Sequence, residues 1–184
     1  RHKPSWEPTG TNALRWIVES VERTGPVRKF YIGNARSDLA TAAGWETVAT
    51  TLEEVGELAR SLTAELASAP DSPRIVVVAE GLGDFLSTPA DAPLVELIKA
   101  AKRSNHLLVA ENESAGWGSS WPIMAEVKAA RTGLLLQPET MEGELVMRTP
   151  FPRVARADFP PGRGFFVARG KVVRVQLPLA SATT

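Results

Sequence analysis

Apolar residues recur along the chain with two periods, one typical of helices and one typical of strands. From Asn12 to Arg23 they form a single stripe, which predicts an amphipathic helix that Asn12 could cap. The β-branched run Arg74–Ala79, bounded by Pro73 and Gly81, is typical of a strand buried on both faces of a parallel sheet. The same patterns predict further helices at 51–68, 93–103 and 121–131, and further strands at 29–33, 107–110 and 133–137.

The order of these elements predicts the fold class. Strands and helices alternate, which favours right-handed crossovers and an α/β fold whose mostly parallel sheet is flanked by helices. Thr51 and Glu54 have the spacing of a capping box at the start of the helix at 51–68. Two apolar runs flank Gly170 in the pattern of a tight turn, which predicts a C-terminal β-hairpin. We expect the central sheet to contain residues 30–32, 75–79, 107–110 and 134–136, and the hairpin to contain residues 164–169 and 171–176.

Composition narrows the class of protein. The 184 residues suit one domain, so we expect residues 1–184 to form a single domain, and the start at Arg1 without a leader suggests a fragment of a larger multi-domain chain. The 21 basic and 21 acidic side chains balance, so no net charge favours nucleic acid or an anionic membrane. The absence of Cys excludes a disulfide scaffold, a cysteine nucleophile and a thiolate metal site. No apolar run approaches the roughly 20 residues that span a bilayer.

The entry to the first helix is the first candidate for chemistry. A working phosphate-binding loop needs a glycine-rich turn, then Lys for charge and Ser/Thr for magnesium. Aligning Pro8–Leu14 with that pattern keeps Gly10 but places Thr11 at the lysine position and Asn12 at the Ser/Thr position. We therefore predict a degenerate nucleotide site at Gly10, Thr11 and Asn12. An ordinary loop followed by an N-cap is the alternative interpretation.

The end of the buried strand at 74–79 is the second candidate. The matching acidic motif would place Asp for magnesium and then Glu for the attacking water after four apolar residues. Here Ala79 occupies the metal position, and Glu80 occupies the position of the catalytic carboxylate. Glu80 is therefore a candidate vestigial catalytic residue. The alternative is a carboxylate that orders a loop.

Three other features could contribute to binding. Asn112 follows the strand at 107–110, at the edge where open α/β sheets bind ligands, so it is a candidate sensor-type contact. Trp117 and Trp121 are candidate partner-binding anchors, with core packing as the alternative. Arginines concentrate near the C-terminus and could bind phosphate or a partner protein. The alternative is that they form an ordinary solvent-exposed surface. His106 has no triad partners and is expected to be a strand-edge side chain.

The order of these parts resembles the motor domains of FtsK and SpoIIIE and the type VII secretion ATPases EccC and EssC, and the resemblance covers nearly the whole chain. It rests on four segments, namely 29–37, 45–55, 126–138 and the closing segment 160–176, which is similar to the family's C-terminal hairpin. The resemblance implies a RecA-like P-loop fold, often present in several tandem copies on a membrane-anchored parent chain. The chain differs from the family at Thr11, Asn12 and Ala79, where the family has its ATP and magnesium ligands.

This combination predicts a catalytically degenerate module, most similar to the C-terminal ATPase module of an EccC or EssC protein. We expect no tightly bound cofactor, weak binding of ATP and magnesium at most, and no metal site. The resemblance implies neighbouring ATPase modules and the C-terminal signal of small helical WXG-type substrates as partners. It also implies a position on the cytoplasmic side of a membrane that only the parent chain contacts. The alternative is a DNA-translocase motor domain that binds and hydrolyses ATP.

Overall fold

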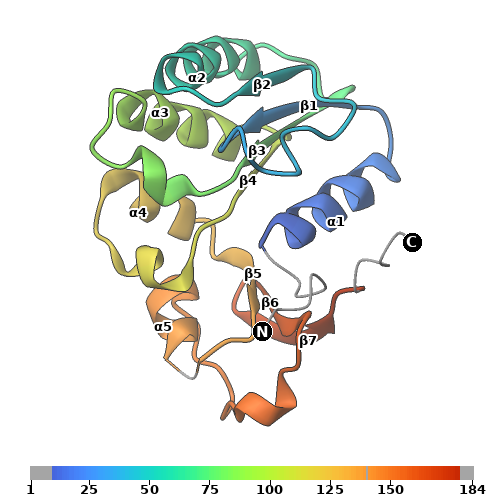
Figure 1. Cartoon of the computed structure of the whole chain (residues 1–184), viewed down its shortest axis with the longest axis vertical. Coiled ribbons are helices and arrows are strands. Elements are labelled where there is room, and N and C mark those ends of the chain that lie inside the picture. The colour runs from blue at the N-terminus through green and yellow to red at the C-terminus, as the bar shows by residue number, and fades with distance from the viewer. Residues whose placement is uncertain (1–9, 140, 179–184) are drawn as a thin grey trace.

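The computed structural model describes residues 10–139 and 141–178, which form an α/β structure with two sheets (Figure 1). In chain order the elements are α1 (Gly10–Glu22), β1 (Val27–Ile32), β2 (Thr47–Ala49), α2 (Leu52–Leu66), β3 (Arg74–Ala79), the 3₁₀ helix η1 (Leu82–Phe85), α3 (Asp91–Lys102), β4 (Leu107–Ala110), the 3₁₀ helix η2 (Ser114–Gly118), α4 (Pro122–Lys128), β5 (Thr132–Leu136), α5 (Glu142–Met147), the 3₁₀ helix η3 (Arg156–Asp158), β6 (Arg163–Ala168) and β7 (Lys171–Gln176).

The first sheet has four parallel strands in the order β2-β1-β3-β4. Ala79 is in register with Ile32 on one side and with Ala110 on the other, so all three strands end at the same edge. The predicted α/β class with a parallel sheet is therefore confirmed.

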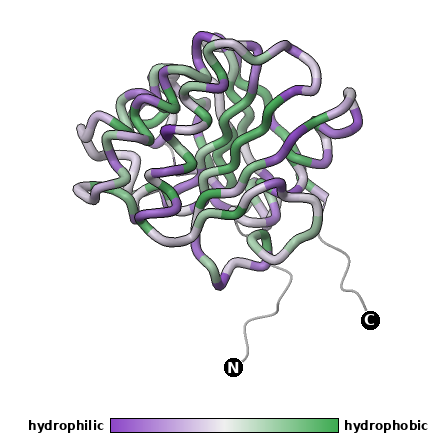
Figure 2. Tube along the Cα trace, turned by 90° about the horizontal axis from the view of Figure 1, so that it is seen from above, coloured by the Kyte–Doolittle hydropathy of each residue, from purple (hydrophilic) through white to green (hydrophobic). Residues whose placement is uncertain are grey.

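Helices cover both faces of this sheet, as the alternation of strands and helices predicts (Figure 1). On one face, Leu14 and Val18 of α1 pack against Val76 and Val78 of β3. On the other face, the remaining inward residues of β3 join a larger cluster built from α2, α3 and α4. β3 is consequently buried on both faces, and the hydrophobic strands occupy the middle of the molecule in Figure 2.

The capping box at the start of α2 is also confirmed. The Thr51 hydroxyl accepts a hydrogen bond from the Glu54 backbone N–H at 3.3 Å, and Glu54 Oε2 accepts one from the Thr51 N–H at 3.0 Å. Two N–H groups near the helix start that lack intrahelical partners are thereby satisfied.

The second sheet is antiparallel and has the order β5-β6-β7. The predicted hairpin around Gly170 is confirmed as β6 and β7, but the expectation that Leu134–Leu136 belongs to the central sheet is wrong. β5 pairs with β6 in the antiparallel sense, and Leu135 packs with Phe165 into a separate hydrophobic cluster. A run of apolar residues identifies a strand without identifying its partner, and within the described residues the parallel sheet ends at β4.

Other differences concern short elements and helix ends. α1 already includes Gly10, so Asn12 lies inside the first turn and is not the cap that the sequence suggested. The three-residue strand β2 and the six-residue helix α5 were not predicted, because neither is long enough to show a period. Among the described helices, none has the length and apolar character needed to cross a bilayer.

Candidate functional site

The candidate site lies where the parallel strands end and α1 begins. Glu80 follows β3 directly, while Glu111 and Asn112 follow β4, so the common register brings these three residues to one edge of the sheet. α1 crosses one face of the sheet with its first turn at this edge (Figure 1). The carboxyl edge of a parallel sheet is where open α/β folds bind their ligands.

Both carboxylate oxygens of Glu80 accept hydrogen bonds from side chains of this chain. Thr11 Oγ1 donates to Oε1 at 2.5 Å, and Tyr31 Oη donates to Oε2 at 2.6 Å. Tyr31 is fully buried, and burial followed by its hydrogen bond to Glu80 raises its pKa well above the ordinary value. The structure therefore brings two predicted site residues, Thr11 and Glu80, into direct contact.

A second carboxylate, which the sequence did not single out, lies against the start of α1. A β-carbon at Gly10 would be 2.5 Å from Glu111 Oε1, so any larger residue at position 10 would displace the Glu111 side chain from this position. Glu111 Oε2 accepts a hydrogen bond from the Gly81 N–H at 3.0 Å. Burial raises the pKa of Glu111, and neighbouring negative charges, Glu80 among them, also raise it. The positive end of a helix dipole stabilises an anion. At the start of α1 the carboxylate of Glu111, which belongs to the chain itself, lies in the place of such an anion.

Asn112 forms its contacts with the loops that follow β3 and β4. Its Oδ1 accepts a hydrogen bond from the Gly83 N–H at 3.1 Å, and its backbone oxygen accepts one from Trp117 Nε1 at 3.1 Å. A β-carbon at Gly116 would lie 2.0 Å from Asn112 Nδ2, so the amide is wedged between two glycine-containing turns. In this structure Asn112 orders the loop that follows β4.

The two tryptophans proposed as anchors differ in their surroundings. Trp117 is partly buried and packs against both the large helical cluster and the cluster of the second sheet. Trp121 is 48% exposed and precedes α4, and α5 exposes Leu145 beside η2. Trp117 therefore connects the two halves of the molecule, while Trp121 presents an indole to solvent.

A comparison with solved structures finds the same fold in ATPases of secretion and conjugation systems. Thermomonospora curvata EccC (ATPases 2 and 3), in complex with a signal sequence peptide, is 23% identical and matches with a TM-score of 0.69 over 94% of this chain and 35% of that chain. EssC (ATPases 2 and 3) from Geobacillus thermodenitrificans is 22% identical, with a TM-score of 0.63 over 92% of this chain and 34% of that chain. The pCW3 conjugation coupling protein TcpA, a monomer form with ATPγS, is 16% identical, with a TM-score of 0.64 over 92% of this chain and 58% of that chain.

The chain has the fold of an EccC-type ATPase domain. The RecA-like P-loop fold that the resemblance implied is therefore confirmed as a fold. The chain spans only about a third of the EccC and EssC chains with which it was compared. Neither a protein-family model nor a curated protein matches the sequence.

Within this EccC-type fold, the residues at the predicted motor positions have the following surroundings. Ala79 is buried and supplies no oxygen ligand, and Thr11 uses its hydroxyl on Glu80. Asn12 is half-buried in the first turn of α1. Over residues 10–139 and 141–178, His, Asp and Glu form no group of three that could hold a metal ion. The polar groups at this edge of the parallel sheet are carboxylates and backbone N–H groups.

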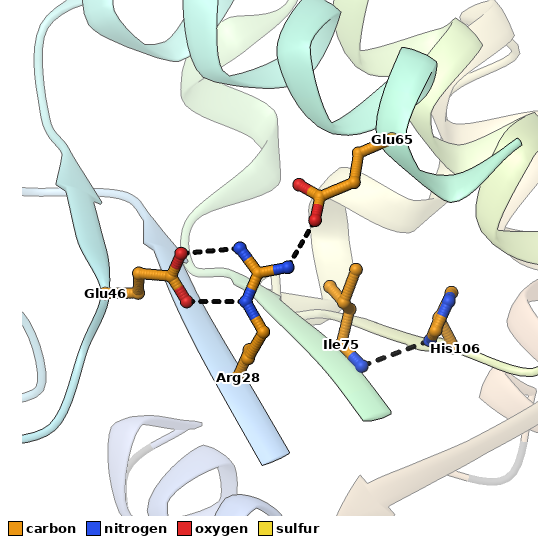
Figure 3. A network of polar contacts seen from close by, with 5 residues as sticks. All are labelled: Arg28, Glu46, Glu65, Ile75 and His106. Atoms are coloured by element: carbon orange, nitrogen blue, oxygen red, sulfur yellow. Dashed lines mark hydrogen bonds and ion pairs between the residues drawn. The ribbon is translucent and has the colours of Figure 1, made fainter. Parts of the chain in front are cut away.

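His106 belongs to the opposite end of the sheet, where β1 and β3 begin (Figure 3). Its Nδ1 accepts a hydrogen bond from the Ile75 N–H at 3.1 Å, which satisfies the backbone at the start of β3. Nearby, Arg28 forms a two-pronged pair with Glu46, at 2.8 and 2.5 Å, and also binds Glu65 (Figure 3). These contacts connect β1 to α2 and to the segment before β2, and they lie outside the candidate site.

Proposed function

We propose that this chain is a catalytically degenerate ATPase-fold module of a type VII secretion motor, which binds other proteins and does not hydrolyse ATP. The observation that carries the proposal is that both carboxylate oxygens of Glu80 accept hydrogen bonds from side chains of the chain itself, those of Thr11 and Tyr31. A carboxylate whose two oxygens accept side-chain hydrogen bonds at 2.5 and 2.6 Å is fixed in place by the chain itself, and its contacts connect the start of α1 and β1 to the end of β3. A Glu held in this way has a structural role at the edge of the sheet, which differs from that of a carboxylate free to orient a water.

Magnesium-ATP fits these residues poorly. Phosphates bind at a helix N-terminus through open backbone N–H groups and a nearby cation. Here the Glu111 side chain lies against Gly10. Three further acidic residues, Glu80, Glu113 and Asp84, are close enough to repel negative charge at Glu111. Polyphosphate would have to enter a region that is already negative, without the lysine that normally compensates it.

The first experiment is a calorimetric titration of this chain with ATP, with and without magnesium. We expect no binding tighter than about 1 mM, because each missing charge-assisted contact is worth roughly 1.5–3 kcal/mol. Micromolar affinity for magnesium-ATP would contradict the proposal. It would favour instead a DNA-translocase motor domain that hydrolyses ATP.

We further propose that the partner is a helical protein segment, either the C-terminal signal of a small WXG-type secreted protein or a neighbouring ATPase module. The EccC structure to which this chain is similar contains a signal sequence peptide, which supports this choice of partner. Another similar structure is the cytoplasmic domain of a type VII secretion ATPase, so the same compartment is proposed here. A large exposed aromatic residue can supply much of the energy for binding such a helix. Trp121 is an exposed aromatic residue of this kind, and we propose it as the anchor.

The docking proposal is tested with Trp121→Ala, using fluorescence anisotropy of labelled tail peptides and of a sibling ATPase module. We expect at least a tenfold loss of affinity for the partner that binds, because removing an aromatic anchor costs about 2 kcal/mol or more. Trp16→Ala is the matched control, since Trp16 is also exposed, at 39%, but lies on α1. Equal affinities for wild type and Trp121→Ala would reject this anchor. Trp117→Ala is unsuitable, because Trp117 packs in two clusters and its loss would destabilise the fold.

A further inference from the structure

One face of the β5–β6–β7 sheet carries apolar side chains that are exposed or half-buried and lie outside the hydrophobic clusters of the described structure. Leu134, Phe166 and Val173 are in register across the three strands, so their side chains share this face. Phe166 is 41% exposed and Val173 is 53% exposed. Leu136 and Val175, two residues further along, extend the same face. None of these five residues is among those that form or border the three hydrophobic clusters.

Cations gather at one end of this apolar face. Arg131 immediately precedes β5, Arg169 lies in the turn between β6 and β7, and Lys171 begins β7 on the same face as Val173. The register pairs Thr132 with Ala168, which places Arg131 and Arg169 at the same end of the sheet. All three cations are exposed, and none forms an ion pair with another described residue.

The charges of the chain are segregated in the same way. Residues 131–184 contain eight basic and four acidic side chains, whereas residues 1–130 contain 13 basic and 17 acidic side chains. The chain as a whole is neutral, so the basic character belongs to the half that contains the second sheet. An approaching acidic partner would be attracted to this half in preference to the parallel sheet.

We propose that this face binds an amphipathic helix of another polypeptide whose last turn carries Asp or Glu. Three strands span about 10 Å across, which matches the diameter of one helix. An apolar stripe at i, i+3 and i+4 would cover Phe166, Val173 and Leu134, while the acidic last turn and the negative end of the helix dipole meet the three cations.

A strand added to the edge of the sheet is a poorer match. β7 is an edge strand within the described structure, and it carries Lys171 and Arg174, which discourage pairing with another strand. The helix proposal depends only on this sheet and its charges. It therefore stands apart from the proposed docking at Trp121.

The test uses a labelled amphipathic peptide of about 16 residues, with Leu at i, i+3, i+4 and i+7 and Glu in its last turn. A second peptide has Lys in place of the Glu residues. Binding to the whole chain is measured by fluorescence anisotropy. We expect the acidic peptide to bind, with an affinity at least tenfold higher than that of the Lys peptide.

Two double variants locate the contact. Arg169→Glu/Lys171→Glu should weaken binding of the acidic peptide at least tenfold, and Phe166→Ser/Val173→Ser should do the same without changing net charge. Arg23→Glu/Arg60→Glu is the control, because it makes the same charge change at two exposed positions on and near other helices and should leave affinity within twofold of wild type. Trp121→Ala should also leave it unchanged, which separates this proposal from the docking proposal.

Several outcomes would overturn the inference. The first is that the acidic peptide fails to bind, and the second is that it binds the charge-reversal variant and its control equally. A third is that the chain sediments with anionic vesicles through Phe166 and Arg169 while ignoring the peptide, which would assign the face to lipid. A fourth is that sedimentation velocity shows a dimer that Phe166→Ser/Val173→Ser abolishes, which would assign the face to a second copy.

Discussion

Replacing Gly164 with alanine is expected to lower the free energy of unfolding by about 3 kcal/mol, near the upper end of the cost of overpacking. A β-carbon at Gly164 would lie 2.2 Å from the Leu135 carbonyl oxygen and 3.0 Å from Leu136 Cα. Both are backbone atoms of the neighbouring strand. They cannot move aside without opening the ladder between β5 and β6, so the hairpin would separate from the strand that attaches it to the core.

Gly133→Ala is the matched control for this substitution, because Gly133 lies on β5 of the same sheet. The nearest atom to its added β-carbon is Met147 Cε at 2.2 Å, the end of a flexible side chain that can change rotamer. We expect a cost below about 1.5 kcal/mol. Urea unfolding monitored by circular dichroism measures both variants. Equal losses would show that the close approach of β5 and β6 is not what requires glycine at position 164.

The sequence predicted the parallel sheet well because its strands are buried on both faces. Such strands read as continuous apolar runs, and Arg74–Ala79 is recognisable on that basis alone. Leu134–Leu136 has the same appearance, yet it joins the antiparallel sheet. Pairing is decided by residues distant in the chain, here Gly164–Phe166, and periodicity carries no information about them.

At the candidate site, too, the sequence identified some of the residues but not their contacts. The sequence singled out Glu80 because it follows a buried strand, and Thr11 because it lies at the start of a helix. It did not predict the hydrogen bond between them, because these residues are 69 positions apart in the chain. Tyr31 and Glu111 were missed. The only usable signal for Tyr31 was a phenol inside a buried strand, which needs a partner for its hydroxyl. Glu111 lay one residue before Asn112, within a segment already under consideration.

Tyr31 is expected to remain protonated in the folded protein well above pH 10, its ordinary pKa region. Burial is the main cause and the hydrogen bond to Glu80 is the second, and both raise the pKa. The direction in which stability changes with pH follows from the difference in proton binding between the folded and unfolded chain. Above about pH 10 the unfolded chain releases the phenolic proton and the folded chain keeps it, so stability from Tyr31 is present below that pH. Above it, stability falls by about 1.4 kcal/mol per pH unit.

The measurement is direct because Tyr31 is the only tyrosine in the chain. Tyrosinate absorbance in the near ultraviolet is followed during an alkaline titration, alongside circular dichroism as a monitor of folding. We expect tyrosinate to appear only as the protein unfolds, whereas in urea it should appear near pH 10. Tyrosinate that forms near pH 10 while the circular dichroism stays native would contradict the buried contact with Glu80.

Glu80→Gln separates the two causes of the raised pKa. Glutamine keeps an oxygen that can accept the Tyr31 hydroxyl but carries no charge, so the repulsion between tyrosinate and carboxylate disappears. Because burial is the larger cause, the pKa of Tyr31 in this variant should fall only part of the way towards 10. A complete return to the ordinary value would mean that the Glu80 charge, and not burial, keeps the phenol protonated. Tyr31→Phe, which has no ionisable group at this position, should lose about 1.5–3 kcal/mol at neutral pH and lack this part of the alkaline loss of stability.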